Sequence, residues 1–169
     1  MTAMHVLNVV LWSVQGFLAL FFFAASVPKL THRGLEQWVG FAELPSVEVT
    51  FIGVMEVLGA VGLVVPMATG ILPWLTPLAA IGLAINVLMA AGFHLRADER
   101  LNAFETMLWA SIATLVAIGR WQLVSSHVEP PPAWLLITAL AVLVPSAIVN
   151  VVILLRRAPS QSPRLEGAR

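Results

Sequence analysis

FIGVMEVLGAVGLVVP, residues 51–66, is an apolar run interrupted by one charged residue, Glu56. Its apolar character extends over about residues 47–67, and a helix needs roughly 20 such residues to cross a bilayer. Backbone in lipid must satisfy its own hydrogen bonds, which a helix does within a single segment. The stretch therefore predicts a transmembrane helix that carries a carboxylate inside the membrane.

The rest of the chain has the same apolar character. Of its 169 residues, 59% are hydrophobic and only 11% are charged, whereas a soluble domain is roughly half apolar and a quarter charged. We therefore predict an all-α polytopic membrane helix bundle, multi-pass in the cell membrane, with no soluble domain and no nucleic-acid partner. The expected spans are about residues 6–28, 47–67, 73–94, 104–123 and 133–155.

The basic residues predict the orientation of this bundle. With five spans, only Arg120 falls on one side of the membrane, and all other Lys and Arg residues fall on the opposite side. Because cytoplasmic loops are enriched in Lys and Arg, we expect the N-terminus outside and the C-terminus in the cytoplasm. The fifth span is needed for this asymmetry. The residues on the basic side are Lys29, Arg33, Arg96, Arg100, Arg156, Arg157, Arg164 and Arg169.

The chain divides into four parts on these grounds. Residues 1–126 form a four-helix transmembrane domain, whose second and third spans are joined by a Pro- and Gly-containing turn within residues 65–77. Residues 127–132 are a proline-rich spacer. The fifth transmembrane helix follows at 133–155, and the arginine-rich tail at 156–169 is expected to be disordered.

Glu56 lies about 13 Å from the cytoplasmic end of its helix, close to the middle of a bilayer. Small residues let membrane helices approach closely, so we expect Glu56 to face protein. Whether it is ionised beside Lys29 or neutral beside Asn86 stays open, although burial favours the neutral acid. The small residues at helical spacing from it are Gly53, Gly59, Ala60 and Gly62.

Polar residues of the other spans gather in the same, cytoplasmic half. Asn86 and His94 share a face of the third span, and Asn102, Glu105 and Trp109 share a face of the fourth. We expect one pocket lined from four helices by Lys29, Glu56, Asn86, His94, Arg96, Asn102 and Glu105. The candidate catalytic residues are Glu56, His94 and Glu105, and the candidate ligand-binding residues are Lys29, Asn86, Arg96, Asn102 and Trp109.

Each of these residues also has a purely structural interpretation. Glu56 can be a protonated acid that joins helices, an interaction of about 0.6–2 kcal/mol, although ionisable residues inside a membrane are functional candidates by default. Lys29 and Arg96 are typical of topology anchors at helix ends. His94 is more often an interfacial histidine than a metal ligand, so no metal site is expected. Cysteine is absent, which excludes disulfides and iron–sulfur ligation.

Four segments together resemble the DoxX-like family of small membrane proteins: KLT (29–31), GFAELPSVEVTFIGVMEVLGAVGLVVP (40–66), GILPWLTPLAA (70–80) and GFHLRADERLNA (92–103). The resemblance covers about residues 8–121 and implies a four-helix bundle. The fifth helix and the arginine-rich tail depart from it. The family motifs correspond here to Lys29, Glu56, Pro66 with Pro73, and His94 with Arg96.

The family takes its name from the membrane subunit of a thiosulfate:quinone oxidoreductase. The resemblance therefore implies a membrane subunit or anchor of a quinone-linked oxidoreductase system, with a lipophile-binding pocket in its cytoplasmic half. Such a subunit has no cofactor of its own, binds quinone or another lipophile, has a soluble oxidoreductase as its partner, and is also a candidate homo-oligomer. Two alternatives stay open: a stand-alone acid–base enzyme of the isomerase type acting on a lipophilic small molecule, and a non-catalytic membrane scaffold.

Overall fold

A computed structural model describes residues 3–37, 40–41 and 44–125, together with 134, 137 and 141. Its long helices are α1 (Ala3–Thr31), α2 (Ser46–Thr69), α3 (Leu75–Arg96) and α4 (Arg100–Ser125), and a short 3₁₀ helix, η1 (Leu35–Gln37), follows α1. All four long helices are long and apolar enough to cross a membrane. The predicted all-helical, multi-pass membrane protein is confirmed.

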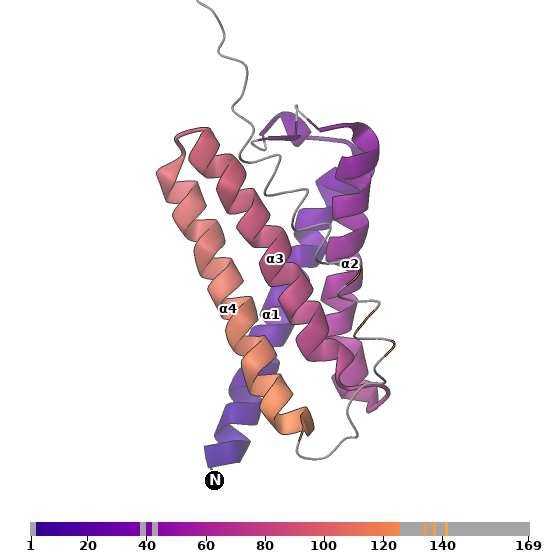
Figure 1. Cartoon of the computed structure of the whole chain (residues 1–169). Coiled ribbons are helices and arrows are strands. Elements are labelled where there is room, and N and C mark those ends of the chain that lie inside the picture. Colours follow the sequence, from indigo (N-terminus) through magenta and orange to yellow (C-terminus); the bar gives the residue numbers. More distant parts are fainter. Residues whose placement is uncertain are drawn as a thin grey trace, which may run out of the picture.

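The four helices form an up-and-down bundle in which consecutive helices run in opposite directions (Figure 1). In sequence order, each helix packs against the next, and α1 also contacts α4. One end of the bundle, here called the basic end, contains the last turns of α1 and α3 and the first turns of α2 and α4. The opposite end is here called the Arg120 end.

The connection between α2 and α3 is a tight turn, as the Pro- and Gly-containing segment predicts. Gly70, with φ 71°, takes the left-handed conformation that ends α2. Pro66 lies inside α2 and has no N–H, so the carbonyl of Gly62 loses its helical donor. The Thr76 hydroxyl donates to that carbonyl at 3.0 Å instead. The hydrogen bond therefore satisfies the Gly62 carbonyl and ties α3 to α2.

An apolar core separates the two ends of the bundle. Leu18 and Phe22 from α1 are buried against Leu63 from α2, Leu83 from α3 and Val116 from α4. Many large apolar side chains on the outer faces are exposed, as expected where lipid replaces water around the bundle. Polar side chains are buried in the interior as well, among them Lys29 with Glu56 toward the basic end and Gln15 with Arg120 toward the Arg120 end.

The structure lengthens the first, second and fourth predicted spans by a few residues, and it shifts the third, predicted at 73–94, by two residues to Leu75–Arg96. The predicted fifth helix at 133–155, the spacer at 127–132 and the tail at 156–169 lie outside the described residues, apart from 134, 137 and 141. Lys29, Arg33, Arg96 and Arg100 lie at the basic end, whereas Arg120 lies at the opposite end. This distribution is the one on which the predicted orientation depends, and the orientation stays a prediction.

Candidate functional site

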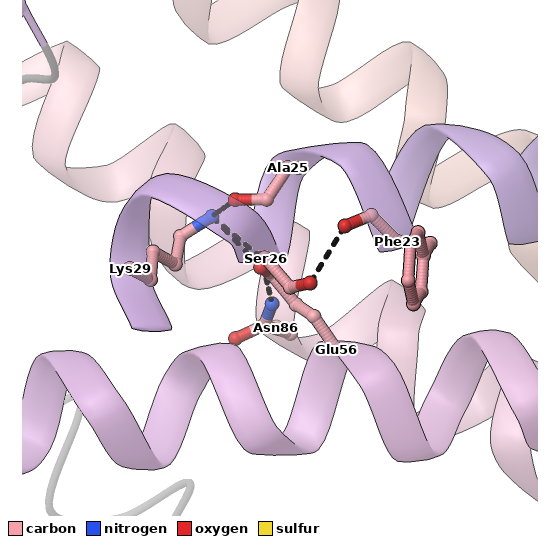
Figure 2. Close-up of polar contacts among 6 residues, drawn as sticks. All are labelled: Phe23, Ala25, Ser26, Lys29, Glu56 and Asn86. Carbon is pink, nitrogen blue, oxygen red and sulfur yellow. Dashed lines mark hydrogen bonds and ion pairs between the residues drawn. The ribbon is translucent and has the colours of Figure 1, made fainter. Parts of the chain in front are cut away.

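Lys29 and Glu56 form a buried ion pair between α1 and α2 (Figure 2). Lys29 Nζ donates to Glu56 Oε2 at 2.8 Å and to Oε1 at 3.0 Å, and it also donates to the Ala25 carbonyl at 2.9 Å. Lys29 is 3% exposed and Glu56 is 4% exposed. The pair is therefore removed from solvent although Lys29 lies only two residues before the end of α1.

Helix geometry explains why Lys29 reaches inward. Side chains on a helix lean toward its N-terminus, which here directs the Lys29 ammonium back along α1 to Ala25 and toward the bundle interior. Gly53 lies opposite on α2, and a Cβ added there would approach Lys29 Cβ to 3.0 Å. The absence of a side chain at Gly53 therefore lets α1 and α2 come close enough for the ion pair.

Asn86 completes this group from α3. Its side-chain amide donates to Glu56 Oε1 at 3.1 Å (Figure 2). Lys29, Glu56 and Asn86, here called the Lys29 cluster, thus join three helices around one carboxylate. The neighbouring Ser26 is fully buried and donates to the Phe23 carbonyl at 2.6 Å. The structure places Glu56 within hydrogen-bond distance of both Lys29 and Asn86, the two neighbours between which the sequence did not decide.

Two described residues of the connection between α1 and α2, Gly40 and Phe41, lie close to the Lys29 cluster or to α3 beside it. The Phe41 ring lies over Lys29, with Nζ 5.5 Å from the ring centroid. Gly40 has a φ of 86°, and a Cβ there would approach the Phe93 ring of α3 to 2.8 Å. Only glycine therefore lets this connection turn so close to α3 and place Phe41 above the ion pair.

The chemistry available in the Lys29 cluster is hydrogen bonding to oxygen and proton exchange. An ammonium donates up to three hydrogen bonds, a carboxylate accepts several, and an amide group does both. Such a set can hold a carbonyl or hydroxyl group of a lipophilic molecule. In the described part of the chain, no group of three His, Asp or Glu residues is arranged to hold a metal ion.

The predicted residues His94 and Asn102 lie in a different group, at the connection between α3 and α4. His94 Nδ1 is 2.8 Å from Glu99 Oε2, and the Asn102 amide donates to the same oxygen at 2.9 Å. The hydrogen bond from Asn102, and then the one with His94, lowers the pKa of Glu99 below its ordinary value. The three residues thus form hydrogen bonds across the connection between α3 and α4. Glu99 was not among the site residues predicted from the sequence.

Glu105, Trp109 and Arg96 have other partners again. Trp109 Nε1 donates to Glu105 Oε1 at 3.3 Å, and the Trp109 ring stacks on Phe21 of α1 with centroids 4.5 Å apart. Arg96 is exposed, with its guanidinium 5.9 Å from the Phe93 ring centroid. Of the eight predicted site residues, the structure therefore places three, Lys29, Glu56 and Asn86, in the Lys29 cluster. The functional roles assigned to all eight stay predictions.

A second buried polar group, at the Arg120 end, was not recognised as a group from the sequence. Arg120 of α4 is fully buried and donates to the side-chain oxygens of Gln15 and Asn8 on α1. A charged residue near the end of the fourth span and an amide in the first were visible signals. They are 105 positions apart, so only the packing of α1 against α4 reveals that they meet.

A groove of about 370 Å³ also lies at this half of the bundle, away from the Lys29 cluster. Its lining is almost entirely apolar and comes from α3 and α4. The lining residues are Ile81, Thr114, Ala117, Ile118, Trp121 and Gln122.

Comparison with known proteins gives one result. A family model described as the DoxX-like family matches residues 13–119. The match contains the whole Lys29 cluster and the His94–Glu99–Asn102 group, and it leaves Asn8 and Arg120 outside. Nothing matches the chain among curated proteins or among solved structures.

Proposed function

The chain belongs to the DoxX-like family, and from this premise we propose that it is a membrane subunit or anchor of a quinone-linked oxidoreductase system. In this proposal the Lys29 cluster holds the head group of a quinone or a similar lipophile. The observation that carries the proposal is the buried ion pair between Lys29 and Glu56, at 2.8 Å, inside a bundle of membrane-spanning helices.

Stability alone is a weak reason for this ion pair. Removing two charges from water has an energetic cost that their attraction only partly offsets, and well-packed apolar residues of similar volume often serve as well or better. Ionisable residues inside a membrane are therefore read first as parts of a binding site or a proton path. Asn86 adds a third polar side chain at the same point, which favours recognition of a polar head group.

The geometry suits a quinone in a specific way. Lys29 can exchange its hydrogen bond to the Ala25 carbonyl for one to a quinone carbonyl oxygen, and Glu56 can pass a proton to or from the corresponding hydroxyl of the hydroquinone. The two electrons that reduce a quinone come from the soluble partner, which this proposal places at the basic end, the predicted cytoplasmic side. The ligand would reach the cluster when the Phe41 ring moves aside from Lys29.

The isomerase alternative has less support from the contacts. It needs Glu56 to act with His94 or Glu105, whose hydrogen bonds in the described residues go to Glu99 and Trp109 respectively. Glu56 alone, with Lys29 as its proton partner, would have to perform both acid and base steps. The scaffold alternative, in which the cluster only joins helices, is separated from the quinone proposal by experiment.

The test is the identification of lipophilic molecules that copurify with the protein in mild detergent. We expect quinone in extracts of the wild type and of Glu48→Gln, a control at an exposed glutamate in the first turn of α2. We expect its loss from Glu56→Gln. The double variant Lys29→Met with Glu56→Gln removes both charges, so it separates loss of ligand from loss of fold. Equal quinone content in all four proteins would favour the scaffold.

A further inference from the structure

Arg120 is enclosed by neutral groups at the end of the bundle opposite the Lys29 cluster. Its Nε donates to Gln15 Oε1, and its Nη1 donates to Asn8 Oδ1 at 2.6 Å. The guanidinium carbon lies 5.0 Å from the centroid of the Trp12 ring. All three neighbours are on α1, and none of them carries a negative charge.

One donor of this guanidinium is left over. Nη2 is buried and has no hydrogen-bond partner within the described residues. The Gln15 amide cannot turn to accept a hydrogen bond from Nη2, because its Nε2 already donates to the Leu63 carbonyl of α2. No carboxylate among these residues pairs with Arg120, and the pKa of an arginine is too high for the group to lose its charge. Within the described residues, Arg120 is thus a buried cation that has one hydrogen-bond donor without a partner and no counter-charge.

The position of Arg120 indicates where a counter-charge would come from. Arg120 lies five residues before the end of α4, and Asn8 lies five residues after the start of α1. At 1.5 Å per residue this is roughly 8 Å from the helix ends, near the boundary between hydrocarbon and head groups. Asn8 and Trp12 are half-buried, so they form the partly exposed side of the cluster.

We propose that Arg120 anchors a second ligand site, which binds a phosphate oxyanion at the Arg120 end of the bundle. Nη1 and Nη2 point in a fixed fork that suits two oxygens of one phosphate. Binding requires Asn8 to give up its hydrogen bond to Nη1 and turn outward, after which Trp12 flanks the bound anion. The phosphate comes from a phospholipid head group or from free phosphate. This site is independent of the function proposed for the Lys29 cluster.

The experiment compares both sources on the purified full chain in detergent. Native mass spectrometry measures retention of phosphatidylglycerol against diacylglycerol, which has the same chains but no phosphate. Thermal unfolding is measured with inorganic phosphate and with chloride at equal ionic strength. Preferential retention of phosphatidylglycerol alone identifies the lipid head group, and stabilisation by inorganic phosphate identifies the free ion. Neither response in the wild type would overturn the proposal.

Two variants locate the site. Arg120→Gln should reduce phosphate or phospholipid binding by about tenfold, because it removes a charge-assisted contact. Arg100→Gln, at an exposed arginine at the basic end, is the matched control and should bind as the wild type does. The same binding in Arg120→Gln and the wild type would exclude Arg120 as the anchor.

Asn8→Asp keeps the test decisive if Arg120→Gln does not fold. It places a carboxylate of nearly the same shape beside Nη1, so the chain then supplies the counter-charge itself. We expect this variant to be more thermostable than the wild type and to lose its response to phosphate or phosphatidylglycerol. An Asn8→Asp protein that still binds as the wild type does would mean that the anion does not bind at Arg120.

Discussion

The two ends of the bundle treat a buried cation in opposite ways. At the basic end, Lys29 is paired with the carboxylate of Glu56, and Asn86 donates to the same carboxylate. At the other end, the hydrogen-bond partners of Arg120 among the described residues are the amide oxygens of Gln15 and Asn8. Lys29 is therefore neutralised within the chain, whereas Arg120 is solvated by dipoles and keeps its net charge.

This difference indicates what each end can bind. A balanced pair can receive a neutral polar head group, such as a quinone carbonyl, because neither charge is lost when hydrogen bonds rearrange. An unbalanced cation favours an anion. Lys29 and the partners of Arg120 all lie on α1. Near each group, α1 packs closely against a glycine of another helix: Gly53 of α2 near Lys29, and Gly119 of α4 near Arg120.

The most direct way to break the comparison is Glu56→Gln, which gives Lys29 the amide environment that Arg120 has. We expect the free energy of unfolding to fall by about 3–5 kcal/mol, the usual effect of leaving one charge of a buried pair without its partner. Adding Lys29→Met should restore most of that loss. Unfolding in mixed micelles with increasing SDS measures both values.

Glu48→Gln, at the exposed glutamate of the same helix, is the control and should change little. If Glu56→Gln proved as stable as the wild type, Lys29 would not depend on a carboxylate. The different partners of Lys29 and Arg120 would then make no difference to the free energy of unfolding.

Gly53 and Gly119 allow a second comparison of the two ends, with a smaller expected effect on stability. An alanine at 53 would meet Lys29 Cβ at 3.0 Å, close to the α1 backbone, whereas an alanine at 119 would meet the tip of Leu11 at 2.9 Å. A leucine tip can rotate away, and a Cβ cannot. We expect Gly53→Ala to cost about 1–3 kcal/mol more than Gly119→Ala, since any gain in helix propensity is common to both.

The same SDS titration measures this difference. Gly53→Ala should also weaken quinone retention, because it moves α1 away from Glu56, and Gly119→Ala should not. Equal stability of the two alanine variants would show that α1 shifts freely at the basic end.

The smallest expected effect concerns Glu99, a carboxylate near the surface that contrasts with buried Glu56. Hydrogen bonds from Asn102 and with His94 hold the pKa of Glu99 below its ordinary value of 4.5. The folded chain thus favours the charged form, which adds stability above pH 4.5 that is lost as pH falls through the lower folded pKa.

Thermal unfolding between pH 6 and the acid limit of the detergent, roughly pH 3, checks this dependence. We expect the wild type to lose slightly more stability toward acid than Glu99→Gln does, and we expect salt to reduce the difference. Parallel curves for the two proteins would show that this carboxylate contributes nothing to folding.

Much of the fold could be predicted because lipid imposes simple requirements on a chain. Apolar runs of sufficient length marked all four described helices, and Pro and Gly marked the turn that begins at Gly70. The helix ends were less predictable. Their last turns, such as the one that holds Lys29, contain polar residues whose hydrogen bonds depend on neighbouring helices.

The candidate site could be predicted only in part. Glu56 was identified from its position in an apolar run, Asn86 from its similar depth, and Lys29 from its place at the end of the first span on the same side of the membrane. His94 and Asn102 share that half of the bundle, yet they pair with Glu99 across the α3–α4 connection. Depth along a helix can be read from the sequence, but the direction in which a side chain faces its neighbours cannot.

The sequence by itself determined that this protein crosses the membrane as helices and that Glu56 needs a polar partner there, because the cost of burying backbone and charge depends on composition and length. Only the tertiary structure decided which partner each charge has. Lys29 meets Glu56 because Gly53 lets α1 and α2 approach, and Arg120 meets Gln15 and Asn8 because α1 packs on α4. These pairings depend on helix rotation and distance, which no single segment fixes.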